Sequence, residues 1–282
     1  DRNEARRSTA VNRRNAATCS AAIHRRIRAG GVHHSIAVPR SRAARWTSAA
    51  RTSSRSSKSA SVRAMRSSRT RARPDIENAP LGINGLVFKT TDVDEMYAHL
   101  QAIGMAGDPP KSFSRPVKLP EGTSDACFRT VHVRHDTFPG GRVYFCEHGT
   151  PELVWRAEWQ VHANGALAMP EFVVASGDHE REANNMATLL RANVAGTGDH
   201  LSVPLAGAAI SFIAPDAYRA RYGDLATSMT ERSSIFGALV MRVKDLDSVR
   251  QIAQAAGVPT IDEATRVVVR EDQFDSVIEF VA

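Results

Sequence analysis

The sequence predicts an α+β protein that is built from repeated strand–helix–strand units and carries a basic segment at its start. Two observations lead to this prediction. The chain has 282 residues, of which 42% are hydrophobic and 24% are charged, a composition typical of a globular protein with ample core. After residue 75, one pattern also recurs three times: an apolar strand, an aspartate that can begin a helix, an amphipathic helix and further strands.

The first copy of the pattern begins with the apolar residues 83–89. Asp92 can cap a helix over residues 93–103, which Gly104 ends, and strands are expected at 126–134 and 142–148. The stretch between helix and strands contains four prolines and is expected to be a loop. The other two copies begin near residues 170 and 236, with helices expected over 178–193 and 245–257.

The basic segment, residues 1–74, differs sharply in charge from the rest. It contains 18 Arg and 1 Lys but only two acidic residues, a net charge of +17, whereas residues 75–282 carry −10. It lacks Phe and Tyr, so it can bury little apolar surface and is expected to be disordered. Three interpretations stay open: an arm that binds nucleic acid, an organelle transit peptide, or text translated out of frame from a GC-rich gene.

Residues 31–39, within the basic segment, look like a native strand. The sequence from Gly31 to Val38 is largely apolar around His33 and His34, and it ends at Pro39. A frameshift or misassigned start on at least one side of these residues would explain the contrast with their surroundings.

Several classes of protein are disfavoured. No apolar run approaches the ~20 residues that span a bilayer, and the start lacks the apolar core of a secretory signal peptide. Three cysteines without a CxxC pair favour a reducing, cytoplasmic location. Phosphate-binding and hydrolase motifs such as GxGxxG, the P-loop, GxSxG and HExxH are missing, so no nucleotide cofactor is expected.

Several sequence details resemble the vicinal oxygen chelate superfamily, which includes glyoxalase I, extradiol dioxygenases and methylmalonyl-CoA epimerase. The letters TTDVD and VKDLD after an apolar strand are similar to the strand–helix junction of its βαβββ unit. The stretch 139–148, followed by 150–156, is similar to a signature of bacterial glyoxalase-like domain proteins. Residues 31–39 resemble the first strand of a first unit.

The resemblance implies an α+β fold of βαβββ units paired into open cupped barrels. It divides the chain into a head, residues 1–75, one unit, residues 76–165, and two paired units, residues 166–282. It also implies a divalent metal, Fe, Mn, Ni or Zn, inside the cup, and a small-molecule substrate. No membrane partner and no nucleic-acid partner are expected, and a homodimer is compatible with the family.

Superfamily metal ligands lie on the first and last strand of each unit. The resemblance places His34, Glu147 and Glu279 as candidate metal ligands, and aligns Phe145 with the last-strand position of its unit. Glycine at 85 and alanine at 238 replace a ligand, so no pair of units has a full set.

The remaining candidates are the carboxylates of Glu171 and Glu279, whose strands are expected to face each other across the 166–282 barrel. Two inward carboxylates would raise the pKa of one of them and favour proton abstraction. The alternative is that one of them is solvated or hydrogen-bonded at a barrel end. A lone strand histidine such as His132 or His148 is more often a structural residue than a ligand. Trp155 next to a basic residue is explained equally well by ordinary packing.

Two main hypotheses follow. The first is a glyoxalase-like enzyme of the lyase, isomerase or ring-cleaving oxygenase type, acting on a small carbonyl or oxygenated substrate. The second is a non-catalytic small-molecule binding protein that has kept the cup and lost its metal ligands. A nucleic-acid-binding protein is a third, weaker alternative that rests on the basic segment alone.

Overall fold

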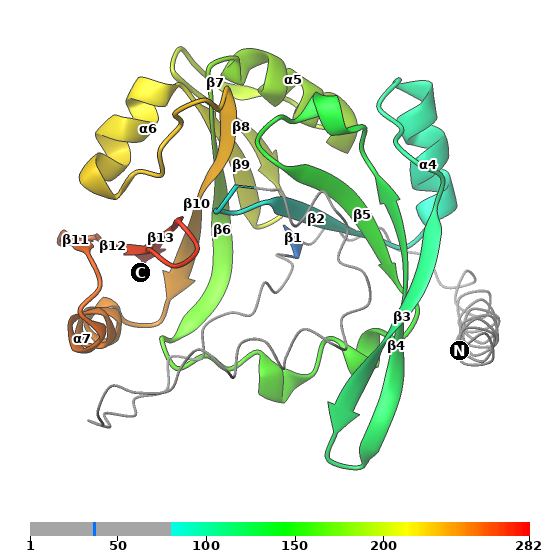
Figure 1. Ribbon diagram of the computed structural model, residues 1–282, viewed down its shortest axis with the longest axis horizontal. Coiled ribbons are helices and arrows are strands. Elements are labelled where there is room, and N and C mark those ends of the chain that lie inside the picture. The colour runs from blue at the N-terminus through cyan, green and yellow to red at the C-terminus, as the bar shows by residue number, and fades with distance from the viewer. Residues whose placement is uncertain (1–35, 38–79) are drawn as a thin grey trace, which may run out of the picture. The chain divides into compact units, whose positions relative to one another are not determined.

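The computed structural model describes residues 36–37 and 80–282, and it contains three consecutive βαβββ units (Figure 1). The first unit comprises β2 (Gly85–Thr90), α4 (Val93–Ala102), β3 (Lys111–Leu119), β4 (Gly122–His132) and β5 (Arg142–His148). The second comprises β6 (Ala166–Ser176), α5 (His179–Leu190), β7 (Ala195–Thr197), β8 (His200–Leu205) and β9 (Ala208–Ile213). The third comprises β10 (Ser234–Val243), α7 (Leu246–Ala256), β11 (Thr260–Asp262), β12 (Arg266–Glu271) and β13 (Ser276–Val281). The predicted α+β fold of repeated βαβββ units is confirmed.

The units form two open sheets. One has the strand order β1-β2-β5-β4-β3, and the other has the order β11-β12-β13-β10-β6-β9-β8-β7. In each unit the first and last strands pair in parallel, and β6 and β10 join the second and third units by antiparallel pairing. Neither sheet closes on itself, so the units are paired as open cups.

Aspartate caps begin two of the three unit helices, as the sequence predicts. The Asp92 side chain accepts hydrogen bonds from the amides of Asp94 and Glu95, both at 2.9 Å. Asp245 begins α7 in the same way, and Gly257 ends that helix in the left-handed conformation at φ 63°. These caps satisfy amides that the helix itself leaves unpaired.

The expected loop after α4 is instead a strand. Residues 111–119 form β3, which makes a long antiparallel hairpin with β4 (Figure 1). The loop prediction is wrong because prolines exclude a strand only where its amides must pair on both sides. Pro116 is tolerated because β3 is the edge strand of its sheet, where an amide without a hydrogen leaves no ladder bond unmade.

Strand β1 (Ile36–Ala37) lies at the opposite edge of the five-stranded sheet. It pairs antiparallel with β2, with Ile36 opposite Phe88 and Ala37 opposite Val87. This is the relation that β6 has to β10 in the other sheet. Ile36 and Ala37, two of the residues predicted to be a remnant of a first unit, therefore pair with β2 as β6 pairs with β10.

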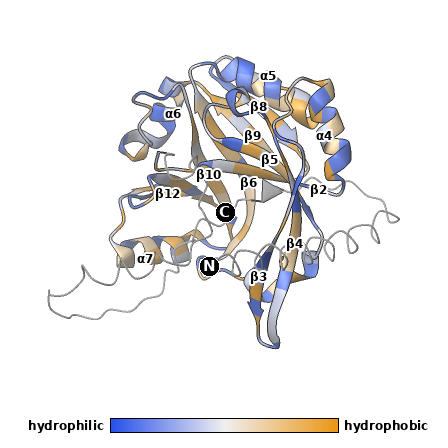
Figure 2. Cartoon of the chain, turned by 45° about the vertical axis from the view of Figure 1, so that its right-hand side comes forward, coloured by the Kyte–Doolittle hydropathy of each residue, from blue (hydrophilic) through white to orange (hydrophobic). Residues whose placement is uncertain are grey.

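The apolar core lies between the strands and the unit helices. Figure 2 shows apolar residues along β5, β9 and β10, and polar residues on the outer sides of α5 and α6. One cluster joins residues of both sheets with α4 and α5, including Phe88, Phe145, Phe172 and Met186. A second cluster packs around α7.

We call the sheet face opposite α4, α5 and α7 the inner face, because the expected cup opens on that side.

Among the helices of residues 80–282, α6 lies outside the repeated units. Helix α6 (Pro215–Tyr222) connects the second unit to the third and packs against Val173, Ala238 and Val240. These residues alternate with those that face α5 and α7, so α6 covers the inner face of the eight-stranded sheet. None of the helices in the described part of the chain is long and apolar enough to cross a membrane.

Candidate functional site

The two predicted carboxylates lie on the same face of the eight-stranded sheet. Glu171 of β6 and Glu279 of β13 both pair in register with Val240 of β10, which runs between them. The alternation of side chains along strands therefore places both on the inner face. The side chain of Glu171 is 20% exposed and that of Glu279 is 6% exposed.

A third side chain, Arg221 of α6, joins the two carboxylates. Its Nη1 and Nη2 donate to the two oxygens of Glu171 at 3.0 and 2.8 Å. Its Nε donates to Glu279 Oε2 at 3.0 Å, and its Nη2 lies 2.8 Å from the same oxygen. Because one nitrogen touches both carboxylates, the nearest oxygens of Glu171 and Glu279 cannot be further apart than twice 2.8 Å.

Glu171 and Glu279 lie close together, as a catalytic pair would require, but the pKa of Glu171 differs from the expectation. Burial alone would raise the pKa of Glu171, yet the hydrogen bonds and charge of Arg221 hold it below its usual value. Burial would lower the pKa of Arg221, and the glutamates raise it instead. The expected rise in one carboxyl pKa does not occur at Glu171, because a cation rather than empty space lies between the two anions.

Neighbouring hydroxyl and imidazole groups complete a polar row on this face. Tyr222 donates to Glu279 Oε2 at 2.9 Å. On the other side lies Ser211 of β9, which lowers the pKa of Glu171, and His200 Nε2 lies 3.3 Å from Ser211 Oγ. The row crosses the sheet from β8 to β13. Both oxygens of Glu171 and Oε2 of Glu279 accept hydrogen bonds, and Glu279 Oε1 lies 3.8 Å from Arg266 Nη1.

The donor set does not fit a divalent metal. A metal between Glu171 and Glu279 would need the position that the Arg221 guanidinium holds, and a cation there would face a buried like charge. Within residues 36–37 and 80–282, no three His, Cys, Asp or Glu side chains converge as a metal site. The roles predicted for Glu171 and Glu279 remain predictions, and any such role must accommodate Arg221.

Glu147, the second predicted ligand, lies apart from Glu279 and faces a helix. It accepts a hydrogen bond from the Val93 amide at the start of α4 at 3.1 Å and lies 3.7 Å from Arg129 Nη1. Burial raises the pKa of this carboxyl despite those two partners. The Glu147 carboxylate is therefore an anion at the N-terminus of α4, where the helix dipole stabilises negative charge. His34, the remaining predicted ligand, lies outside the described residues.

The strand register also corrects one alignment. Val87 of β2 and Val240 of β10 hold the same position relative to their helix caps, and they pair with Tyr144 and Glu279. Tyr144, not Phe145, therefore corresponds to Glu279. Phe145 and Glu147 share the helix-facing side of β5 because side chains two residues apart point the same way.

The inner face of the five-stranded sheet carries a continuous row of rings, which we call the aromatic strip: Phe113, Phe128, His148 and Trp155. Phe113 stacks on Phe128 with ring centroids 5.2 Å apart, and Phe128 meets His148 edge-on at 5.3 Å. His148 stacks on Trp155 at 5.8 Å and accepts a hydrogen bond from the indole nitrogen at 3.0 Å. Phe113 and Trp155 are 38% and 40% exposed, so the strip presents apolar rings to solvent.

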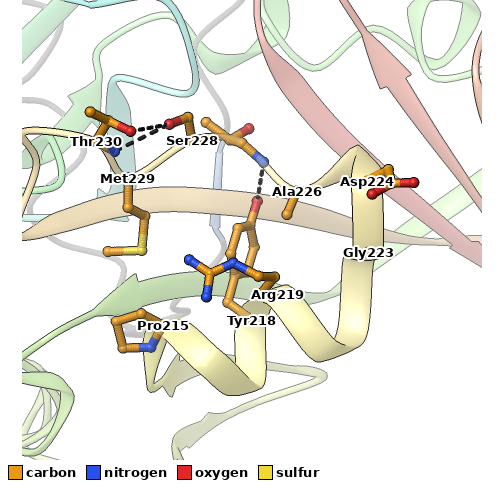
Figure 3. A pocket seen from close by; sticks show the side chains of 10 residues that line it. Pro215, Tyr218, Arg219, Gly223, Asp224, Ala226, Ser228, Met229 and Thr230 are labelled. Atoms are coloured by element: carbon orange, nitrogen blue, oxygen red, sulfur yellow. Dashed lines mark hydrogen bonds between the residues drawn. The ribbon is translucent and has the colours of Figure 1, made fainter.

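A separate pocket of about 580 Å³ lies beside α6 (Figure 3). Tyr218 points from the helix toward the chain after Ala226, where its hydroxyl accepts from the Thr227 amide at 3.1 Å. The same hydroxyl donates to the Gly237 carbonyl at 2.9 Å, so it is fully engaged. None of the residues predicted from the sequence lines this pocket.

Comparison with known proteins adds the family. Residues 58–190 match the family model of the glyoxalase-like domain. Over these residues the chain is similar to the glyoxalase-like domain family. The predicted resemblance is thereby confirmed, and the match extends from the end of the basic segment through the helix of the second unit. No curated protein matches the chain in sequence.

Solved structures with similar folds include several enzymes. A hypothetical protein from Staphylococcus aureus has a TM-score of 0.46 at 9% identity, covering 70% of this chain and 65% of that one. Methylmalonyl-CoA epimerase from Mycobacterium tuberculosis gives 0.32 at 18%, covering 43% and 94%. BphC, a halotolerant catechol dioxygenase, gives 0.39 at 10%, covering 71% and 67%. The chain thus matches 65% of the length of the Staphylococcus aureus protein.

The sequence-based search missed Arg221 and Tyr222. Their helix is short and polar, and it lies between two units rather than within one. The available signals were Pro215 at the first helical position and the tyrosines at 218 and 222, which are four residues apart and so share a helix face.

Proposed function

We propose that this glyoxalase-like protein binds a small molecule without the help of a metal, on the inner face of the five-stranded sheet. The observation that carries the proposal is the position of Arg221. Glu171 and Glu279, the predicted catalytic pair of the second and third units, are both bound to this arginine. Helix α6 covers the sheet face on which they lie.

The first unit also supports binding of a small molecule without a metal. Its predicted ligand Glu147 points to the start of α4 and away from the inner face. The inner face instead presents the aromatic strip, whose rings are partly exposed and held in place by ring contacts and by the Trp155–His148 hydrogen bond. Rigid, exposed rings favour the binding of a flat apolar ligand, because stacking then costs little side-chain freedom.

Isothermal titration of the full chain with naphthalene derivatives in excess EDTA tests this proposal. We expect saturable binding to one site with and without EDTA. Trp155→Ala should weaken binding at least tenfold, whereas Trp159→Phe, a matched tryptophan on a neighbouring turn, should leave it unchanged. Binding that disappears in EDTA, or no binding of any naphthalene probe, would overturn the proposal.

A further inference from the structure

The aromatic strip ends in a positive charge on both sides. Lys89 Nζ lies 5.6 Å from the centre of the Trp155 ring, and the Arg115 guanidinium carbon lies 5.5 Å from the centre of the Phe113 ring. Both cations share the inner face with the rings: Lys89 is opposite Cys146 in the β2–β5 register, and Arg115 is two residues from Phe113 on β3. Four rings therefore lie between two cations on one face of the sheet.

These two cations differ from most of their neighbours in having no carboxylate partner. In the same unit, Lys111, Arg129, Arg134 and Arg156 each form an ion pair with an aspartate or glutamate. Within the described residues, no carboxylate lies within ion-pair distance of Lys89 or Arg115. Lys89 is half-buried, so its charge is less well solvated than that of a surface lysine and gains more from an anionic partner.

Two of the described groups close to Lys89, the Cys146 thiol and the His148 ring, are uncharged at neutral pH. Burial raises the pKa of the Cys146 thiol to about 12, so the side chain opposite Lys89 is an uncharged thiol at neutral pH. Burial and the charge of Lys89 lower the pKa of His148 to about 4, so its ring is also neutral. Because His148 Nδ1 accepts the Trp155 hydrogen bond, the remaining nitrogen, Nε2, carries the hydrogen and is a donor.

We propose that the aromatic strip binds a planar aromatic carboxylate, with its ring against the exposed part of the strip beside Trp155 and its carboxylate at Lys89 and His148 Nε2. This inference rests on the proposed function and names the ligand class of the same site. Charge complementarity carries it: an exposed row of rings favours a flat ligand, and a half-buried unpaired ammonium beside an imidazole donor favours an anion at that end. Arg115, at the far end of the strip and exposed, adds only long-range attraction.

The test compares two probes of the same shape, 2-naphthoate and the neutral 2-naphthylmethanol, by isothermal titration in excess EDTA. We expect 2-naphthoate to bind about tenfold more tightly or better, since a charge-assisted hydrogen bond of ~1.5 kcal/mol corresponds to that factor. Lys89→Met should remove this preference and leave the affinity for the alcohol unchanged. Lys118→Met, which removes a positive charge from the opposite face of β3, is the matched control and should leave both affinities unchanged.

Each outcome separates the ligand class from the proposed function. Equal affinity for the two probes, or an unchanged preference in Lys89→Met, overturns the carboxylate assignment while the binding function stands. A tenfold loss in Arg115→Met with none in Lys89→Met also overturns it, because the anion would then lie at the other end. If neither probe binds, the proposed function itself fails.

Discussion

Arg221 of α6 and Glu171 of β6 form a bidentate ion pair, in which Nη1 donates to Oε1 at 3.0 Å and Nη2 donates to Oε2 at 2.8 Å. The same guanidinium reaches Glu279 of β13. A helix outside the repeated units thus supplies the cation for two carboxylates that the repeats bring to one face. The pair explains why α6 stays on the inner face.

Replacing Arg221 with alanine should destabilise the protein by about 3–5 kcal/mol, because Glu171 would lose its ion-pair partner and Glu279 its nearest cation. Urea denaturation monitored by circular dichroism measures this. Arg219→Ala, on the same helix but with a 70% exposed side chain, should change stability by no more than ~0.5 kcal/mol. Adding Glu171→Gln and Glu279→Gln to Arg221→Met should recover most of the loss. A triple variant as unstable as Arg221→Ala would show that the ion pair is not the cause.

The position of α6 depends on a glycine in β10. A Cβ atom at Gly237 would lie 2.6 Å from the Tyr218 ring, so Gly237→Ala should push α6 from the sheet and cost about 1–3 kcal/mol. Gly177→Ala is the control, since its Cβ would meet nothing closer than 3.7 Å. Equal thermal stability of the two variants would contradict the tight packing of α6 on β10.

Glu182 of α5 gives the protein a pH dependence of definite sign. Its carboxylate is buried and accepts hydrogen bonds from Ser176 at 2.6 Å and Ser234 at 3.1 Å, and no cation among residues 80–282 forms an ion pair with it. Burial raises its pKa above the usual value despite these bonds. The folded state therefore binds the proton more tightly, and its contribution to stability is present in acid and is lost as pH rises through the raised pKa.

Glu182→Gln should remove this contribution to the pH dependence, and the variant should be more stable than the parent at neutral pH. Chemical denaturation at a series of pH values measures both effects. Glu180→Gln, an exposed carboxylate on the same helix, should leave the profile unchanged. A Glu182→Gln variant that loses stability at neutral pH would mean that the ionised carboxylate is favourable in the folded protein.

The repeated units were predictable because each carries its own local signals. Asp92 and Asp245 mark helix starts and Gly257 marks a helix end, and these caps act through neighbouring backbone atoms. Strand β3 was missed because its prolines are compatible with a strand only at a sheet edge, and edge position is a property of the whole sheet.

The site was predictable only in part for a similar reason. Strand alternation and the family resemblance brought Glu171 and Glu279 to one face, since both are set by position within a unit. The partner of these glutamates, Arg221, arrives on a connecting helix whose path no local pattern records. The side of the sheet on which Glu147 lies follows from the β2–β5 register, which the sequence alignment missed by one residue. A shift of one residue moves every side chain of a strand to the opposite face.

Manganese binding tests the central claim most directly, namely that Arg221 holds the place between Glu171 and Glu279. Isothermal titration with Mn²⁺ should be performed on the full chain and on the Glu171→Gln/Glu279→Gln double variant, each checked for folding by circular dichroism. Any sites elsewhere in the chain contribute equally to both proteins. The account predicts the same stoichiometry and affinity for the two. One additional equivalent of Mn²⁺ bound by the parent chain and lost in the double variant would contradict it.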